Sequence, residues 1–142
     1  VTYATAAITT TTTFAVVTGC SKTITLDRSA HVLIWIDGGA YVSTVTMNNS
    51  SRVTVAMHRG GSALPNAGWR EFDLQNSENA SPTTVNAKGT FSLCAMETLA
   101  AGTYTYDIRA RHTAGTNLVA AVVGGTSTSA TPITMIIQII YQ

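Results

Sequence analysis

The sequence has little charge. Asp, Glu, Lys and Arg make up 11% of the 142 residues, against roughly a quarter in an average soluble domain. The net charge is +1, which creates no strong basic field for nucleic acid or an anionic membrane. No run of about eighteen apolar residues is present either, so no segment is expected to span a bilayer. We therefore expect neither nucleic acid nor a membrane among the partners.

Cysteine is also scarce. Cys20 and Cys94 are the only two, so one disulfide at most is possible, and they cannot form a four-ligand zinc site alone. Cys94 lies in an apolar run and Cys20 follows a glycine near a turn. We expect two free thiols at small core or turn positions.

Motifs for catalysis and for metal binding are missing. There is no Gly-x-Ser-x-Gly elbow, and His31, His58 and His112 have no partner at a fixed spacing. No His-x-His, His-x-x-x-His or Cys-x-x-Cys pair occurs, and the acidic residues are scattered. The sequence predicts a protein that is not an enzyme and has no resident cofactor or metal. A metal on a three-fold axis, needing one ligand per subunit, remains open.

Threonine dominates the polar content, with an unbroken run over residues 9–13. Threonine is β-branched and suits a pleated, half-buried surface. The glycine pairs at 38–39, 60–61 and 124–125 mark turns. We expect strands at 21–26, 31–37, 40–47, 52–59, 69–74, 90–96, 103–111, 117–123 and 133–141. The range 69–74 is a short strand within a long loop, and the other eight strands, without a helical period, predict an all-β antiparallel sandwich or jelly roll.

Two of these strands are apolar on both faces. Residues 31–37 place Val32 on one face and Trp35 on the other, and residues 133–141 have isoleucines on both. In residues 52–59, by contrast, Val53, Val55 and Met57 are expected to point inward and Thr54, Ala56 and His58 toward solvent. Residues 103–111 are expected to alternate in the same way. A second apolar face on a sheet strand indicates contacts between subunits.

The N-terminal segment is expected to be separate from the domain. We assign residues 1–17 to an extended arm and 18–142 to a single domain. The arm has high β propensity but few large apolar groups, so it gains stability by lying on a neighbour. Phe14, Val16 and Val17 are its expected anchors.

Residues 60–88 form the least regular stretch, and long irregular segments often carry function. Trp69, Arg70 and Phe72 are candidates for a sugar-binding loop, although an aromatic anchor that holds the loop is the preferred interpretation. Outward Arg109 and Arg111 beside Asp107 are more consistent with an ion pair between subunits than with nucleic-acid binding.

Residues 98–111 (TLAAGTYTYDIRAR) resemble the Gly-Thr-Tyr strand of trimeric jelly rolls of the C1q/TNF-like class. A hairpin at Gly115-Thr116 and an apolar strand at 133–141 complete a pattern also similar to small bacteriophage β proteins. As a departure from that class, residues 1–17 show no collagen or coiled-coil pattern. The resemblance implies a homotrimer with the aromatic and C-terminal strands near its axis. The expected trimer interface comprises Trp35, Tyr104, Tyr106, Ile137, Ile139 and Tyr141.

The function expected from these features is structural. A trimeric bacteriophage head decoration protein fits best, because a compact domain with a short arm has nothing to span a fibre. It would bind the major capsid protein or another virion protein on the capsid surface after assembly in the host cytoplasm. The alternatives are the receptor-binding tip of a tail fibre and a lectin-like carbohydrate-binding module.

Overall fold

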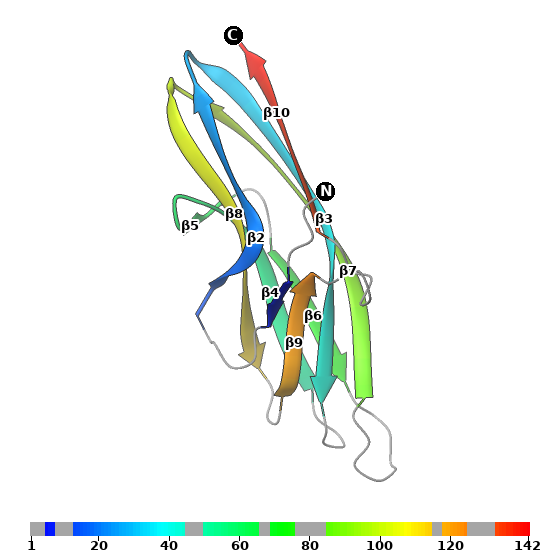
Figure 1. Cartoon of the computed structure of the whole chain (residues 1–142). Helices are drawn as coiled ribbons and strands as arrows, with labels where there is room; N and C mark the ends of the chain where they lie inside the picture. The colour runs from blue at the N-terminus through cyan, green and yellow to red at the C-terminus, as the bar shows by residue number, and fades with distance from the viewer. Residues whose placement is uncertain are drawn as a thin grey trace.

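The structure is a computed structural model of the chain. It describes residues 5–7, 13–44, 50–65, 69–75, 85–114, 118–124 and 133–142, and their side chains at 13–40, 52–65, 69–71, 89–112 and 133–142. All regular structure in these residues is β-strand, in two antiparallel sheets that face each other as an elongated sandwich (Figure 1). Among the described residues no helix is long and apolar enough to cross a membrane. The predicted all-β sandwich is confirmed.

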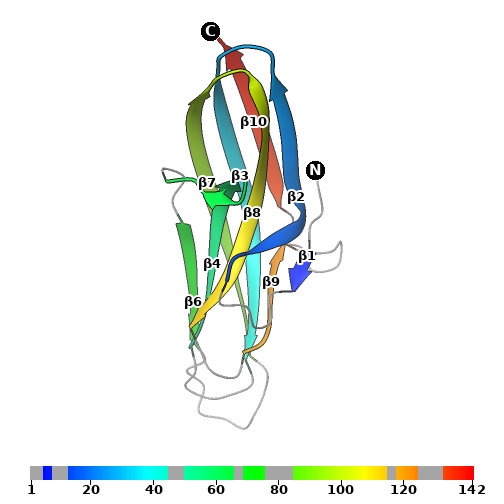
Figure 2. The ribbon, with the colours of Figure 1, turned by 90° about the vertical axis from the view of Figure 1, so that its left-hand side faces the viewer.

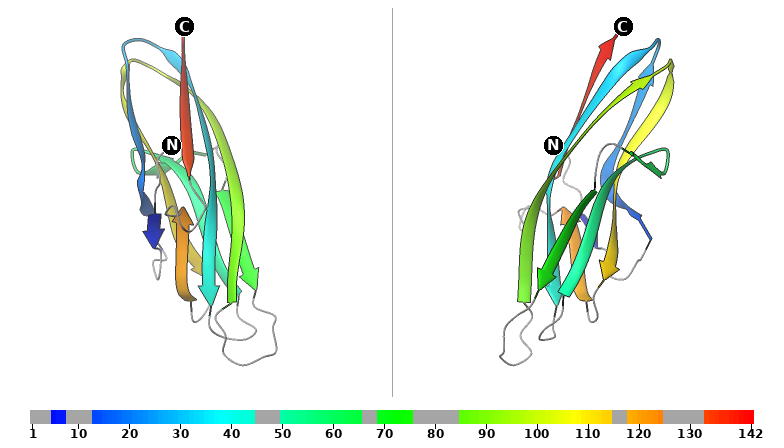
Figure 3. Two further views of the ribbon diagram at one scale, coloured as in Figure 1. Left: turned by 45° about the vertical axis from the view of Figure 1, so that its right-hand side comes forward. Right: turned by 180° about the vertical axis from the view of Figure 1, so that it is seen from behind.

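The first sheet is organised around β3 (Ala30–Thr44). β7 (Val85–Leu99) pairs with β3 along its whole length. On the other edge of β3, β10 (Thr134–Tyr141) and β9 (Leu118–Gly124) lie end to end (Figure 3, left). β1 (Thr5–Ala7) pairs with the outer edge of β9. The outer edge of β10 pairs with no strand of the described chain.

The second sheet has β4 (Ser50–Arg59) and β8 (Gly102–Ala114) at its centre. β2 (Ala15–Leu26) pairs with β8 at one side. β5 (Ser62–Ala63) and β6 (Trp69–Gln75) pair with β4 at the other. Figure 2 shows the order β6, β4, β8 and β2 from left to right.

The core lies between the sheets, where alternate residues of each strand point inward. On β4 the inward residues are Val53, Val55 and Met57, and on β8 they are Tyr106, Ile108 and Ala110; all six are buried. Both sets follow the predicted alternation, because a period of two places every second side chain on one face of a sheet.

The packing beneath Gly38 on β3 leaves no room for a larger residue at this position. A Cβ atom at this position would lie 2.8 Å from Ile133 Cγ1 and 2.8 Å from Phe91 Cζ. Real carbon atoms do not approach so closely, so any larger residue would have to displace two buried side chains. The glycine therefore permits β10, β3 and β7 to share one core layer.

The N-terminal region differs in detail from the expected arm. β2 begins at Ala15, so the expected arm–domain boundary at residue 17 lies inside a strand. Thr5–Ala7 pairs with β9 as β1. Residues 1–4 and 8–12 lie outside the described part of the chain. The strand extends further because Val17 is fully buried in the core.

Candidate functional site

An apolar surface covers the outer face of the first sheet. In the strand register Trp35 of β3 lies between Ile136 of β10 and Cys94 of β7, and Leu33 lies beside Met96. Three of these side chains are strongly exposed for large apolar groups: Met96 at 63%, Ile136 at 54% and Ile140 at 45%. We call this surface the outer patch, comprising Leu33, Trp35, Cys94, Met96, Ile136 and Ile140.

Polar residues border the outer patch at both ends. At one end His31 donates from Nδ1 to Thr98 Oγ1 (2.9 Å) and accepts at Nε2 from Gln142 Nε2 (2.7 Å). At the other end Asp37 pairs in register with Thr134 and Ser92. On β10 the exposed Gln138, opposite Leu33, lies between Ile136 and Ile140 and interrupts the apolar surface on that strand. Exposed apolar side chains with polar neighbours are typical of a surface that binds another protein.

Part of the outer face of the second sheet, around Thr54, Ala56 and His58, is covered by the chain itself. Thr54, Ala56 and His58 were predicted to face solvent, and this is wrong: their exposures are 1%, 0% and 4%. The Phe14 ring packs on His58, with its centroid 5.1 Å from that of His58 and 5.8 Å from that of Trp69. Trp69 lies beside Ala56 in the strand register, and Glu71 and Arg111 lie on either side of Thr54.

Arg111 completes this cover. Its guanidinium carbon lies 4.6 Å from the Phe14 ring centroid and 5.2 Å from that of Trp69, a favourable distance for attraction between a cation and an aromatic face. We call Phe14, His58, Trp69 and Arg111 the Phe14 cluster. The His58 Nδ1–H donates to the carbonyl of Gly61 (3.1 Å), whereas His58 Nε2 and Arg111 Nε are buried without hydrogen-bond partners.

Beside the Phe14 cluster, Asp107 forms an ion pair within the chain. Arg109 Nε donates to Asp107 Oδ1 at 2.7 Å, and Arg109 Nη2 to Oδ2 at 3.3 Å. The hydrogen bond with Asp107 raises the pKa of Arg109. The carboxylate proposed for an ion pair between subunits is thus already paired with a neighbour on its own strand.

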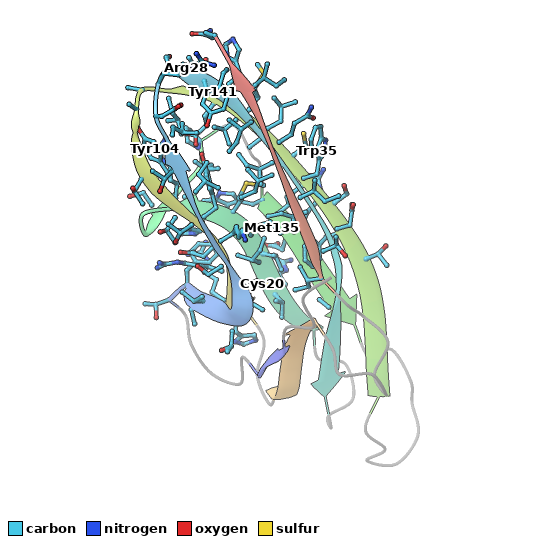
Figure 4. The ribbon with its side chains drawn as sticks, turned by 45° about the horizontal axis from the view of Figure 1, so that its top comes forward. Cys20, Arg28, Trp35, Tyr104, Met135 and Tyr141 are labelled. Atoms are coloured by element: carbon cyan, nitrogen blue, oxygen red, sulfur yellow. The ribbon has the colours of Figure 1, made fainter. Side chains whose placement is uncertain are left out.

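The residues expected at the trimer interface lie in different places. Trp35 is part of the outer patch. Ile137 and Ile139 face the opposite side of β10 and pack against the core. Tyr141, 42% exposed, and Tyr104 lie near the end of the sandwich that carries the β2–β3 and β7–β8 turns (Figure 4).

Tyr106 lies inside the core of its own chain. Its hydroxyl donates to Glu97 Oε2 (3.0 Å), and Glu97 also pairs with Arg59 (2.9 Å). Burial and the hydrogen bond to Glu97 raise the pKa of Tyr106. The three residues come from β8, β7 and β4, so they form a polar link between the two sheets.

The residues predicted for the arm and the ligand loop are partly united by the fold. Phe14 meets Trp69 in the Phe14 cluster, although the sequence analysis placed them in separate sites. Val16 is 43% exposed. Trp69 is 52% exposed and Arg70 is exposed next to it. The side chain of Phe72 lies outside the described part of the structure.

A groove of about 380 Å³ separates β2 from β10. Figure 4 shows Cys20 and Met135 between these strands, with Trp35 beyond β10. Burial raises the pKa of Cys20 to about 11. Both cysteines are free as predicted, but Cys94 is exposed, because it is on the outer face of β7. The groove is lined by Gly19, Cys20, Ser21, Lys22, Ile24, Ile133, Met135, Ile137 and Ile139.

Sequence reasoning identified the second apolar face of β3 and of β10 but missed Met96 and the role of Phe14. Met96 could have been found from the alternation of β7, in which Phe91, Leu93 and Ala95 point inward. No local signal places Phe14 on Trp69. Within the described residues no group of three or more side chains is suited to hold a metal ion.

The chain was compared with protein-family models and with curated protein sequences. No family model matches it, and no curated sequence does. The function is therefore inferred from the outer patch, the Phe14 cluster and the groove.

Proposed function

We propose that this chain is a non-enzymatic structural subunit of a bacteriophage virion, which assembles as a homotrimer and decorates the capsid surface. The observation that carries the proposal is the outer patch. Its side chains are apolar and come from three paired strands. Met96, Ile136 and Ile140 are exposed, Leu33 and Trp35 are partly exposed, and no segment of the described residues pairs over this face.

The energetics favour a partner on this surface. Fully burying a large apolar side chain contributes about 1.5–3 kcal/mol. Met96, Ile136 and Ile140 are each near half exposed, so each would contribute about 1 kcal/mol when covered. A partner with the same composition would leave no buried charge unpaired, and a second copy of the chain supplies such a surface.

The strand order supports a jelly roll. In the first sheet, β3 has β7 on one edge and β9 and β10 on the other, with β1 outside β9. In the second sheet the order is β2, β8 and β4, and both β5 and β6 pair with the far side of β4. The chain passes from one sheet to the other at every connection except those from β4 to β6 and from β9 to β10. Jelly rolls of two sheets occur both in viral capsid proteins and in lectins. The strand order therefore does not distinguish these functions, and the outer patch is the feature that favours assembly.

The trimer is tested by sedimentation of the purified chain at micromolar concentration. We expect a mass of three chains, and a shift to monomer in Met96→Glu, because a carboxylate in the interface would be buried without a partner. Thr103→Glu is the matched control: it adds the same charge at an exposed position on the outer face of the second sheet and should remain trimeric. A stable wild-type monomer would exclude the proposal.

The virion role has a separate test. The chain is mixed with undecorated capsids, and we expect binding in multiples of three and greater resistance of the shells to heat. A tail-fibre tip would instead bind host cells and leave the capsids unoccupied, which would contradict decoration.

A lectin is the second candidate, and the exposed Trp69 favours it. An indole face of this exposure can stack on a sugar ring, and Arg70 and Glu71 lie exposed beside it. A glycan array is the measurement. Binding lost in Trp69→Ala but kept in Met96→Glu would establish this function in place of the structural role.

A further inference from the structure

The groove between β2 and β10 is bordered by two strand edges. Within the described residues β2 pairs only with β8, and β10 pairs only with β3. Natural proteins protect such edges with charged or inward-pointing side chains, prolines or bulges. β2 has a register irregularity between Val16 and Ser21, and Lys22 at the groove. β10 has the sequence TMIIQIIY, with no charge, proline or glycine.

The sequence of β10 is close to a chemical palindrome centred on Gln138. Ile139 and Ile140 follow Gln138 as Ile137 and Ile136 precede it. A two-fold axis perpendicular to the sheet at Gln138 would place Ile136 of one chain opposite Ile140 of the other. Ile137 would lie opposite Ile139 in the same way. Like residues would therefore meet on both faces of the joined sheet.

We propose that β10 pairs antiparallel with β10 of a second copy, about a two-fold axis at Gln138, so that two first sheets become one continuous sheet. The hydrogen-bonding groups on the free edge of β10 find partners, and backbone pairing of this kind is a general mode of strand recognition. The contact is isologous, because both copies use the same residues.

The groove supplies the apolar part of this contact. Ile137 and Ile139 point toward it and are only partly buried. In the paired state the Ile137 and Ile139 side chains of the second copy lie beside them, over the same side of the sheet. Cross-strand pairs of β-branched residues stabilise antiparallel sheets. Lys22 lines the groove from β2, across from β10, and within the described residues the outer edge of β10 pairs with no strand.

This inference does not depend on the proposed virion role. The edge of β10 adjoins the outer patch, and Ile136 and Ile140 belong to both. A two-fold contact along the edge leaves Trp35, Cys94 and Met96 available for a three-fold contact through the patch. Where both operate, the edge contact joins trimers to one another.

Disulfide cross-linking tests the pairing. Gln138→Cys is made in a Cys94→Ser background, because Cys94 is exposed. At the axis the two new thiols are on directly opposite residues, whose Cα atoms lie about 4.5–5.5 Å apart in an antiparallel pair, within the range of a disulfide. We expect near-complete conversion to a covalent dimer under mild oxidation.

Thr134→Cys in the same background is the matched control. In the proposed register its two copies lie eight residues apart along the strand, roughly 27 Å, and they should remain monomeric on a denaturing gel. Equal cross-linking of both variants, or none at Gln138→Cys, would overturn the inference.

A second measurement does not require a substitution. Hydrogen exchange of the β10 amides is followed at increasing protein concentration, and we expect those on the free edge to slow at least tenfold when the copies pair. Exchange that does not change with concentration would also overturn the inference. If the trimer dissociates in Met96→Glu but Gln138→Cys forms no covalent dimer, the proposed trimer is supported and the β10 pairing is excluded. If Gln138→Cys forms a covalent dimer but the wild type forms no trimer, the β10 pairing is supported and the proposed trimer is excluded.

Discussion

The outer faces of the two sheets differ in how far other parts of the chain cover them. On the second sheet, Phe14 packs on His58, Trp69 lies beside Ala56 and Arg111 beside Thr54 in the strand register. Asp107 is paired with Arg109. On the first sheet, Met96, Ile136 and Ile140 remain exposed. Part of one face is covered by Phe14 from the N-terminal region together with Trp69 and Arg111, and the other has no such cover among the described residues.

The difference shows that the exposed fraction of a side chain in this protein does not simply follow its polarity. The covered face contains the polar and charged groups that water would solvate, and the uncovered face contains the aliphatic side chains that water disfavours. A monomer would be expected to show the reverse, so the arrangement favours a partner for the first sheet.

The largest effect is expected from removing the cover of the second sheet. Phe14→Ala exposes His58 and Arg111 and deletes the ring contacts that hold Trp69. Because Phe14 is only partly buried, we expect a loss of about 3 kcal/mol in the free energy of unfolding, at the low end for a phenylalanine truncation. Urea denaturation measures it. Val16→Ala, at an exposed position on β2, should change the same quantity by less than about 0.5 kcal/mol; equal losses would show that the Phe14 cluster adds nothing.

A smaller effect is expected from the ion pair on the same face. Asp107→Asn leaves the partly buried Arg109 without its carboxylate, and we expect a loss of about 2 kcal/mol, less than for a fully buried pair. The control is Glu71→Gln, which removes an exposed partner of Arg52 at 3.6 Å and should cost about 0.5 kcal/mol. Thermal unfolding of the two variants separates the cases, and a reversed order would mean that the Asp107 pair is solvated.

The interior between the two faces should respond to alkaline pH. Burial raises the pKa of Cys20 from 9.0 to about 11, so the folded state holds its proton more tightly than the unfolded state does. This stabilisation is complete below pH 9 and is lost as the pH rises toward 11, by at most about 2 kcal/mol. The raised pKa of Tyr106 acts in the same direction. Denaturation at pH 8 and pH 11 should show a smaller loss in Cys20→Ala than in the wild type; identical losses would contradict the assignment.

The smallest effect concerns the reactivity of the thiols, and it reports on the uncovered face. Cys94 lies in the outer patch and Cys20 in the core. In Met96→Glu we expect one thiol per chain to react quickly with a water-soluble thiol reagent, and in the assembled wild type a slower reaction of that thiol. Mass spectrometry of the labelled chain assigns it. Rapid labelling of Cys94 in both proteins would show that the outer patch is not covered.

Much of the architecture could be predicted because alternation is a local property. The strands at 52–59 and 103–111 were predicted from every second apolar residue, and their inward side chains are those expected. The two apolar faces of β3 were visible in Val32 and Trp35 in the same way. Pairing between distant segments leaves no such trace, so the contact of Phe14 with Trp69 could not be predicted from the sequence.

The long pairing of β3 has a consequence for how the chain folds. Its partners β7, β9 and β10 all come later in the sequence, and Tyr141 pairs with Ala30. Sheets built from such distant segments close large loops before they gain contacts, and they fold in milliseconds to seconds rather than microseconds. Until β10 docks, the edge of β3 that it will cover remains free to accept the same strand from another chain. Slow folding at high concentration is therefore expected to yield domain-swapped chains, linked through an exchange of β10.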